Sequence, residues 1–155
     1  MAARPRNRSR RRGPVGRQAR ILTLQYLYAR DIHASDDPDD FLEWLCDEFP
    51  AEQSARRTAA AMITAIAGDA TNLDNSIQRY APALPVNLLA VVDRNILRVA
   101  IYELTYREQL PRNVVVNEAV ELASMFGSES SARFVNGVLG SVLNDLPQST
   151  DNDAG

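Results

Sequence analysis

Apolar residues recur every three or four positions along most of this 155-residue chain, and this periodicity limits the fold more than any other feature of the sequence. The spacing places apolar side chains on one face of an α-helix. In residues 88–107, for example, Ile96, Ala100 and Leu104 share a face. Because no hairpin signal, internal repeat or alternation of strands with helices accompanies the periodicity, the sequence predicts an all-α fold.

Proline, glycine and acidic residues indicate where the predicted helices begin and end. Asp37 is a suitable N-cap and Pro38 a suitable first helical residue, while Pro50 ends the same helix. The run Val114–Val116 is β-branched and compatible with a short strand, but the helical pattern that follows it favours a helix. Gly68 weakens the third helix locally. The expected helices cover residues 17–34, 38–49, 52–80, 88–107, 113–126 and 131–146.

The chain has the length of one domain with a genuine core. Pro82 and Pro85 interrupt the helical pattern between its two halves. We therefore expect subdomains at residues 17–81 and 82–147, followed by a polar tail at 148–155.

Nothing in the sequence suggests a membrane or an exported protein. The longest apolar run, Leu88–Val92, is far shorter than the roughly 20 residues that cross a bilayer. The basic amino end lacks the apolar stretch of a secretory signal. The single cysteine, Cys46, has no partner for an internal disulfide. These features indicate a cytoplasmic location.

Charge is distributed very unevenly along the chain. The net charge is −3, yet the first 20 residues hold eight arginines and no carboxylate, while the remainder holds nine arginines and 20 carboxylates. An acidic body with a strongly basic arm indicates a specific electrostatic contact. We expect residues 1–16 to form a disordered arm. The arginines of the first 20 residues are Arg4, Arg6, Arg8, Arg10, Arg11, Arg12, Arg17 and Arg20.

Catalytic and metal-binding patterns are not found in the sequence. There is no glycine-rich phosphate loop, no nucleophile elbow and no metalloprotease motif, and the single histidine, His33, has no evident partners. Lysine is absent from the chain, which excludes a Schiff-base lysine and a phosphate-loop lysine. The sequence therefore predicts a protein without catalysis, cofactor or metal.

The arginine-rich arm suits single-stranded RNA, because a guanidinium binds phosphate in a fork and stacks on exposed bases. About five phosphate contacts would give a salt slope near −3.5 on a single strand. Arg17 and Arg20 are three residues apart on the first helix, and Tyr28 lies two turns beyond Arg20, so we expect a fixed surface that continues the arm. The alternative is a generic basic tail on a protein-binding scaffold.

Four stretches resemble the family of the transcription antitermination factor NusB: ARILTLQYLY at 19–28, VDRNILRVAIYEL at 92–104, LPRNVVVNEAVELASMFG at 110–127 and ARFVNGVLGSVL at 132–143. With the linking helices, the resemblance covers about residues 17–147. It implies about seven helices in two perpendicular subdomains, three helices and then four. One more short helix is therefore expected near residues 85–90.

The resemblance also implies a function and a set of contact residues. The function is binding of the boxA element of nascent ribosomal RNA together with the ribosomal protein NusE, in a complex with other Nus factors that makes RNA polymerase resist termination. Asp93 and Arg98 match a motif near the partner surface, and the alternative for these two is an intrahelical pair that holds the bundle. The RNA surface would include the arginine arm, Arg20, Gln25, Tyr28, Tyr80, Ser130, Arg133 and Phe134.

The sequence departs from the common family pattern at a few positions and leaves alternatives open. The family commonly has an acid directly before the serine that opens the last helix, where this chain reads Glu129-Ser130-Ser131 and so has Ser130 at that position. Arg94 and Arg133 stand where the family often has Lys, which keeps the charge and alters the geometry. NusB-like domains also occur fused to ribosomal RNA methyltransferases, but no catalytic domain follows residue 147. Both a monomer and a homodimer are compatible with the helix pattern.

Overall fold

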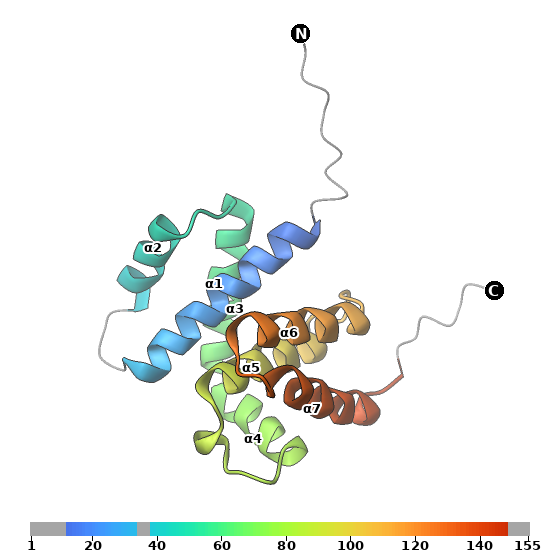
Figure 1. Ribbon diagram of the computed structural model, residues 1–155. Coiled ribbons are helices and arrows are strands. Elements are labelled where there is room, and N and C mark those ends of the chain that lie inside the picture. The colour runs from blue at the N-terminus through green and yellow to red at the C-terminus, as the bar shows by residue number, and fades with distance from the viewer. Residues whose placement is uncertain (1–11, 34–37, 149–155) are drawn as a thin grey trace, which may run out of the picture.

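The computed structural model describes residues 12–33 and 38–148, and within these ranges the chain forms seven α-helices, one short 3₁₀ helix and no strand (Figure 1). The all-α prediction is therefore confirmed. The helices are α1 Arg12–Ile32, α2 Pro38–Glu48, α3 Gln53–Gly68, α4 Ala70–Tyr80, η2 Val86–Leu88, α5 Val91–Tyr106, α6 Arg112–Phe126 and α7 Ser131–Asp145.

Helix α5 lies at the centre of the bundle and packs against α1, α3, α4, α6 and α7. Its apolar residues cover more than one face, and Ile96, Leu97, Val99 and Ala100 are all at most 3% exposed. A helix that is apolar on most sides is stable only when neighbours surround it. In the view of Figure 1, helix α1 crosses the molecule in front of α3, with α2 on one side and the helices of the second half on the other.

The long helix expected at residues 52–80 is two helices, so that prediction was wrong. The break lies at Asp69, whose φ of −117° and ψ of 15° are not helical. Gly68 lowers the cost of leaving the helix there, because a glycine in a helix interior is unfavourable. The break turns α4 so that Leu73 and Ile77 are buried, with α4 packed against α5 and α7. The subdomain boundary expected at residues 81–82 stays a prediction.

Other helix ends differ from the prediction by a few residues. Helix α1 begins at Arg12 instead of residue 17, so the arm predicted to be disordered is helical at its carboxyl end. Helix α5 begins at Val91, and the 3₁₀ helix η2 precedes it, which confirms the expected short helix near residues 85–90. Val114–Val116 lie in α6, as favoured. The expected N-cap Asp37 lies outside the described residues.

Gly127 joins α6 to α7 where no side chain fits. A Cβ at this position would overlap the Ser131 side chain and lie 2.7 Å from the Ala123 carbonyl oxygen. Gly127→Ala is therefore expected to lower the free energy of unfolding by about 1–3 kcal/mol, measured by urea denaturation. Gly140→Ala, in α7, is the matched control, because a Cβ there meets nothing within 4 Å. Equal stability of the two variants would contradict this account.

Candidate nucleic-acid interface

Tyr80, Arg133 and Phe134, which the sequence analysis assigned to the RNA surface, line one cavity of about 300 Å³. Tyr80 is the last residue of α4, and the other two lie in the first turn of α7. The packing of α4 against α7 brings them together across more than 50 positions of sequence. The rest of the wall comes from residues 81–84, from Leu89 after η2, and from Gly137 and Val138 of α7; Leu84 is 50% exposed.

The Tyr80 side chain is held in place at the edge of this cavity. Its hydroxyl donates a hydrogen bond of 2.9 Å to Oδ2 of Asp145, and the Arg79 guanidinium lies 5.4 Å from the centroid of its ring. The hydrogen bond to Asp145 raises the pKa of Tyr80. The phenol therefore stays a neutral donor, and the ring is oriented for contact with a flat partner.

Cationic and polar groups lie next to the aromatic residues. Arg133 is exposed and has no hydrogen bond or ion pair to any residue that the structure describes. Ser130 directly precedes α7 and is exposed, and no side chain caps the helix there. Free backbone N–H groups and an unpaired guanidinium at one helix start suit an anion such as phosphate.

Gln25 and Tyr28 lie in a different cavity, of about 360 Å³, which shares no lining residue with the first. None of its lining residues is charged, and three of its aromatic side chains, Tyr28, Phe49 and Phe126, are 39–47% exposed. The Oε1 atom of Gln25 is buried and has no hydrogen-bond partner among the described residues. The structure thus separates two groups that the sequence analysis placed on one surface.

Arg20 is not part of an exposed surface, which corrects the expectation that it continues the basic arm. The residue is 8% exposed. Its Nε and Nη2 atoms donate to the Glu103 carboxylate of α5 at 2.7 and 2.8 Å. Arg17 is 41% exposed at its side chain and pairs with Glu118 of α6. The five arginines up to Arg11 lie outside the described residues, and of Arg12 only the backbone is described.

Asp93 and Arg98 do not form the intrahelical pair considered as the alternative. Arg98 donates to both carboxylate oxygens of Asp74, at 2.7 and 2.9 Å, and to Asp31 at 2.9 Å. Asp31 also accepts from Arg94 at 2.9 Å. Burial acts to raise the pKa of Asp31, but the bonds and charges of the two arginines outweigh it and lower the pKa. Arg98 thus ties α5 to α1 and α4.

Asp93 is left without a partner in the same helix turn. It is 8% exposed, and its Oδ1 atom has no hydrogen bond within the described part of the chain. A buried acceptor without a donor is costly to the folded state unless a partner supplies one. Asp93 therefore remains a candidate for contact with another molecule.

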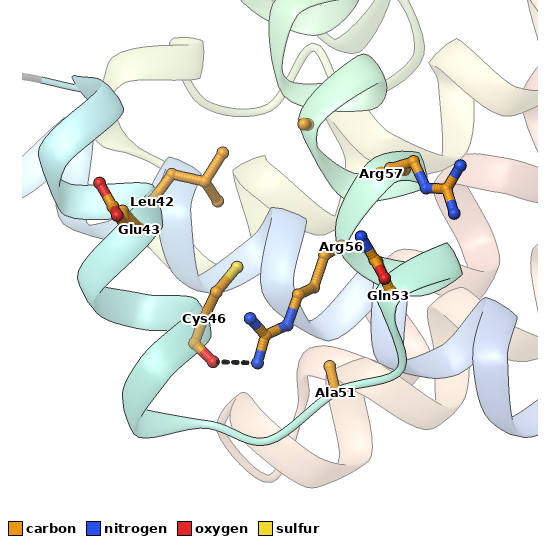
Figure 2. A pocket seen from close by; sticks show the side chains of 8 residues that line it. Leu42, Glu43, Cys46, Ala51, Gln53, Arg56 and Arg57 are labelled. Atoms are coloured by element: carbon orange, nitrogen blue, oxygen red, sulfur yellow. Dashed lines mark hydrogen bonds between the residues drawn. The ribbon is translucent and has the colours of Figure 1, made fainter.

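A further cavity of about 590 Å³ lies between α2 and α3, and a hydrogen bond at this cavity joins the two helices (Figure 2). Arg56 reaches across from α3 and donates a hydrogen bond of 2.7 Å to the Cys46 carbonyl in the last turn of α2, as Figure 2 shows. A cation at the carboxyl end of a helix interacts favourably with the helix dipole. The Glu43 carboxylate and the exposed Arg57 line the cavity too, and the exposed Asp47 and Glu48 follow on α2, so charges of both signs lie on this face.

The described residues hold no group of three or more His, Cys, Asp or Glu side chains that could bind a metal ion. None of the helices found in residues 12–33 and 38–148 has both the length and the apolar character of a membrane span.

Comparisons with known proteins agree with the fold. The model of the NusB family matches residues 17–144. The transcription antitermination protein NusB of Dehalococcoides mccartyi is 43% identical over 130 residues, which cover 84% of this chain and 90% of that protein. The NusB protein of Bacillus cereus is 35% identical over 130 residues, which cover 84% of this chain and 98% of that protein.

Solved structures show the same arrangement of helices. NusB of T. maritima superimposes with a TM-score of 0.77 at 33% identity, covering 83% of this chain and 90% of that one. A NusB chain solved with NusE and dsRNA has a TM-score of 0.77 at 22% identity, covering 86% and 98%. From the family match and the relatives' identity, this chain belongs to the NusB family of transcription antitermination proteins, whose function involves no catalysis.

Proposed function

We propose that this protein binds the single-stranded boxA element of ribosomal RNA leader transcripts together with the ribosomal protein NusE. It would act in the cytoplasm, within an elongation complex of RNA polymerase and other Nus factors. The observation that carries the proposal is the cavity lined by Tyr80, Arg133 and Phe134. The related NusB chain that was solved with NusE and dsRNA supports the proposal of one protein partner and one RNA partner.

The chemistry of this cavity suits an unpaired nucleotide. A base has an exposed π-face only when it is not stacked in a duplex, and aromatic side chains such as Phe134 and Tyr80 are its usual partners. Arg133, with Ser130 beside the helix start, would bind the adjoining phosphate. The arginine arm would add contacts along the strand. Base stacking, phosphate binding and the arm therefore act on one strand.

The second cavity suits the protein partner better than the RNA. Its lining carries no charge to attract phosphate, and its exposed aromatic residues are typical of protein interfaces. We assign Gln25 and Tyr28 to contact with NusE, where a donor from the partner would satisfy the buried Gln25 oxygen. The unpartnered Asp93 oxygen, on the helix that also supplies Val92 to this cavity, would be satisfied in the same way.

Phe134→Ala is expected to weaken binding of a labelled boxA RNA by about 5- to 150-fold, because loss of one base–aromatic stack costs about 1–3 kcal/mol. Fluorescence anisotropy with NusE present measures the effect, and a thermal melt checks folding because Phe134 packs against the core.

The matched control is Phe126→Ala, which removes an aromatic side chain from the second cavity. It should leave binding to RNA alone unchanged and reduce the gain in affinity that NusE provides. Wild-type affinity of a folded Phe134→Ala variant would exclude this cavity as the RNA site. If the wild-type protein does not bind boxA RNA even with NusE, the proposed function is wrong.

A further inference from the structure

Arg17 lies in α1, directly after the basic arm of residues 1–16. Its side chain is partly exposed and is already bound to a carboxylate. Its Nε and Nη2 atoms donate to Oε2 and Oε1 of Glu118, each at 3.1 Å. The side chains are 41% and 17% exposed. A planar guanidinium that meets two carboxylate oxygens in this way presents the same fork that it would offer to a phosphate.

The partial exposure of Arg17 makes exchange feasible. Ion pairs at a protein surface stabilise the protein by only about 0–1 kcal/mol, and although the Glu118 side chain is only 17% exposed, a phosphate that is held by other contacts can displace the carboxylate. The neighbouring pair of Arg20 and Glu103 differs, because its side chains are only 10% and 2% exposed. Within the described part of α1, Arg17 is therefore the residue at which RNA and the protein's own carboxylate can compete.

A second carboxylate on α6 acts on Arg17 through its charge alone. The hydrogen bonds and charge of Glu118 raise the pKa of Arg17 most, burial opposes them, and the charge of Glu121 adds a smaller increase. Glu121 is exposed and forms no hydrogen bond with Arg17. Glu118 thus contacts Arg17 directly and Glu121 does not, although both carry the same charge.

We propose that Glu118 is an intramolecular competitor of RNA: it occupies the Arg17 guanidinium in the free protein and is displaced by a phosphate when the strand binds. Each strand that reaches Arg17 must break the pair, so Glu118 limits the affinity of the amino end for RNA. The inference rests on the proposed RNA-binding function and adds to it a residue that acts against binding.

The test compares Glu118→Gln with Glu121→Gln, since both variants remove one negative charge from the same helix. Glu118→Gln is expected to bind boxA RNA about 2- to 5-fold more tightly, the range that an ion pair at the protein surface allows. Its salt slope should change little, because the complex contains the same number of phosphate contacts in the variant and in the wild type. Glu121→Gln should change the affinity less and leave the slope unchanged.

A second pair of variants shows whether the gain passes through Arg17. In an Arg17→Gln background, the effect of Glu118→Gln should disappear. Glu118→Asp keeps the charge but shortens the side chain, and it too should bind RNA more tightly than the wild type, which provides a test if the Gln variant does not fold.

The outcomes separate this inference from the function on which it rests. If the wild-type protein binds boxA RNA and the two Gln variants behave alike, Glu118 is not a competitor. A gain that persists without Arg17 would also overturn the inference. If neither the wild-type protein nor any of the variants binds RNA in the presence of NusE, the proposed function itself is wrong.

Discussion

Glu103→Ala is expected to lower the free energy of unfolding by about 3–5 kcal/mol, because it leaves the Arg20 guanidinium buried without its carboxylate. Arg20 and Glu103 are 8% and 1% exposed and are joined by two hydrogen bonds of 2.7 and 2.8 Å. Since a domain is usually stable by only about 5–15 kcal/mol, this loss is a large fraction of the total. Urea denaturation followed by circular dichroism measures it.

Two controls identify the cause of this loss. Replacing both partners, as in Arg20→Met with Glu103→Leu, should recover much of the stability, because no uncompensated charge remains. Arg79→Ala removes a pair with Asp145 whose side chains are 72% and 50% exposed, and it should cost less than about 1 kcal/mol. A single Glu103→Ala variant as stable as Arg79→Ala would show that the buried pair does not hold α1 to α5.

Deletion of residues 1–11 is expected to make RNA binding much less sensitive to salt. The deletion removes five arginines, and each phosphate contact on a single strand contributes about −0.7 to the salt slope, so the slope should become shallower by about 3.5. A fourfold rise in salt would then cost the full-length protein roughly 100-fold more affinity than the truncated one. Filter binding at 50 and 200 mM salt with boxA RNA measures the difference.

The matched control keeps the length of the arm and removes its charge. Replacing the same five arginines with glutamine should reproduce the effect of the deletion, because counterion release depends on charge and not on chain length. An unchanged slope in either variant would show that the arm does not contact phosphate, and the generic basic tail would then be the better interpretation.

The class of fold and most helices followed from local patterns in the sequence. The side chains of α5 are apolar at helical spacing, and the helix is buried as that pattern predicts. The break between α3 and α4 was missed, because Gly68 reads as a local weakness in a continuous pattern. The new direction of α4 depends on its packing against α5 and α7, which no local pattern contains.

Residue types and family motifs predicted which side chains could bind RNA, and the structure decided which of them are available. Tyr80, Arg133 and Phe134 were predicted, and they do line one cavity. Arg20 was predicted to be exposed, and it is buried because Glu103, 83 positions away in the sequence, lies opposite it.

The sequence by itself determined that this chain is helical and that its positive charge is concentrated at the amino end, since both properties follow from residue type and spacing alone. Only the tertiary structure decided which arginines are free and which are bound to a carboxylate. Arg17, Arg20 and Arg98 pair with Glu118, Glu103 and Asp74, which come from other helices. The physical reason is that the strength of an ion pair depends on the distance between the two charges in space. The packing of the helices sets that distance, and the local periodicity of the sequence does not.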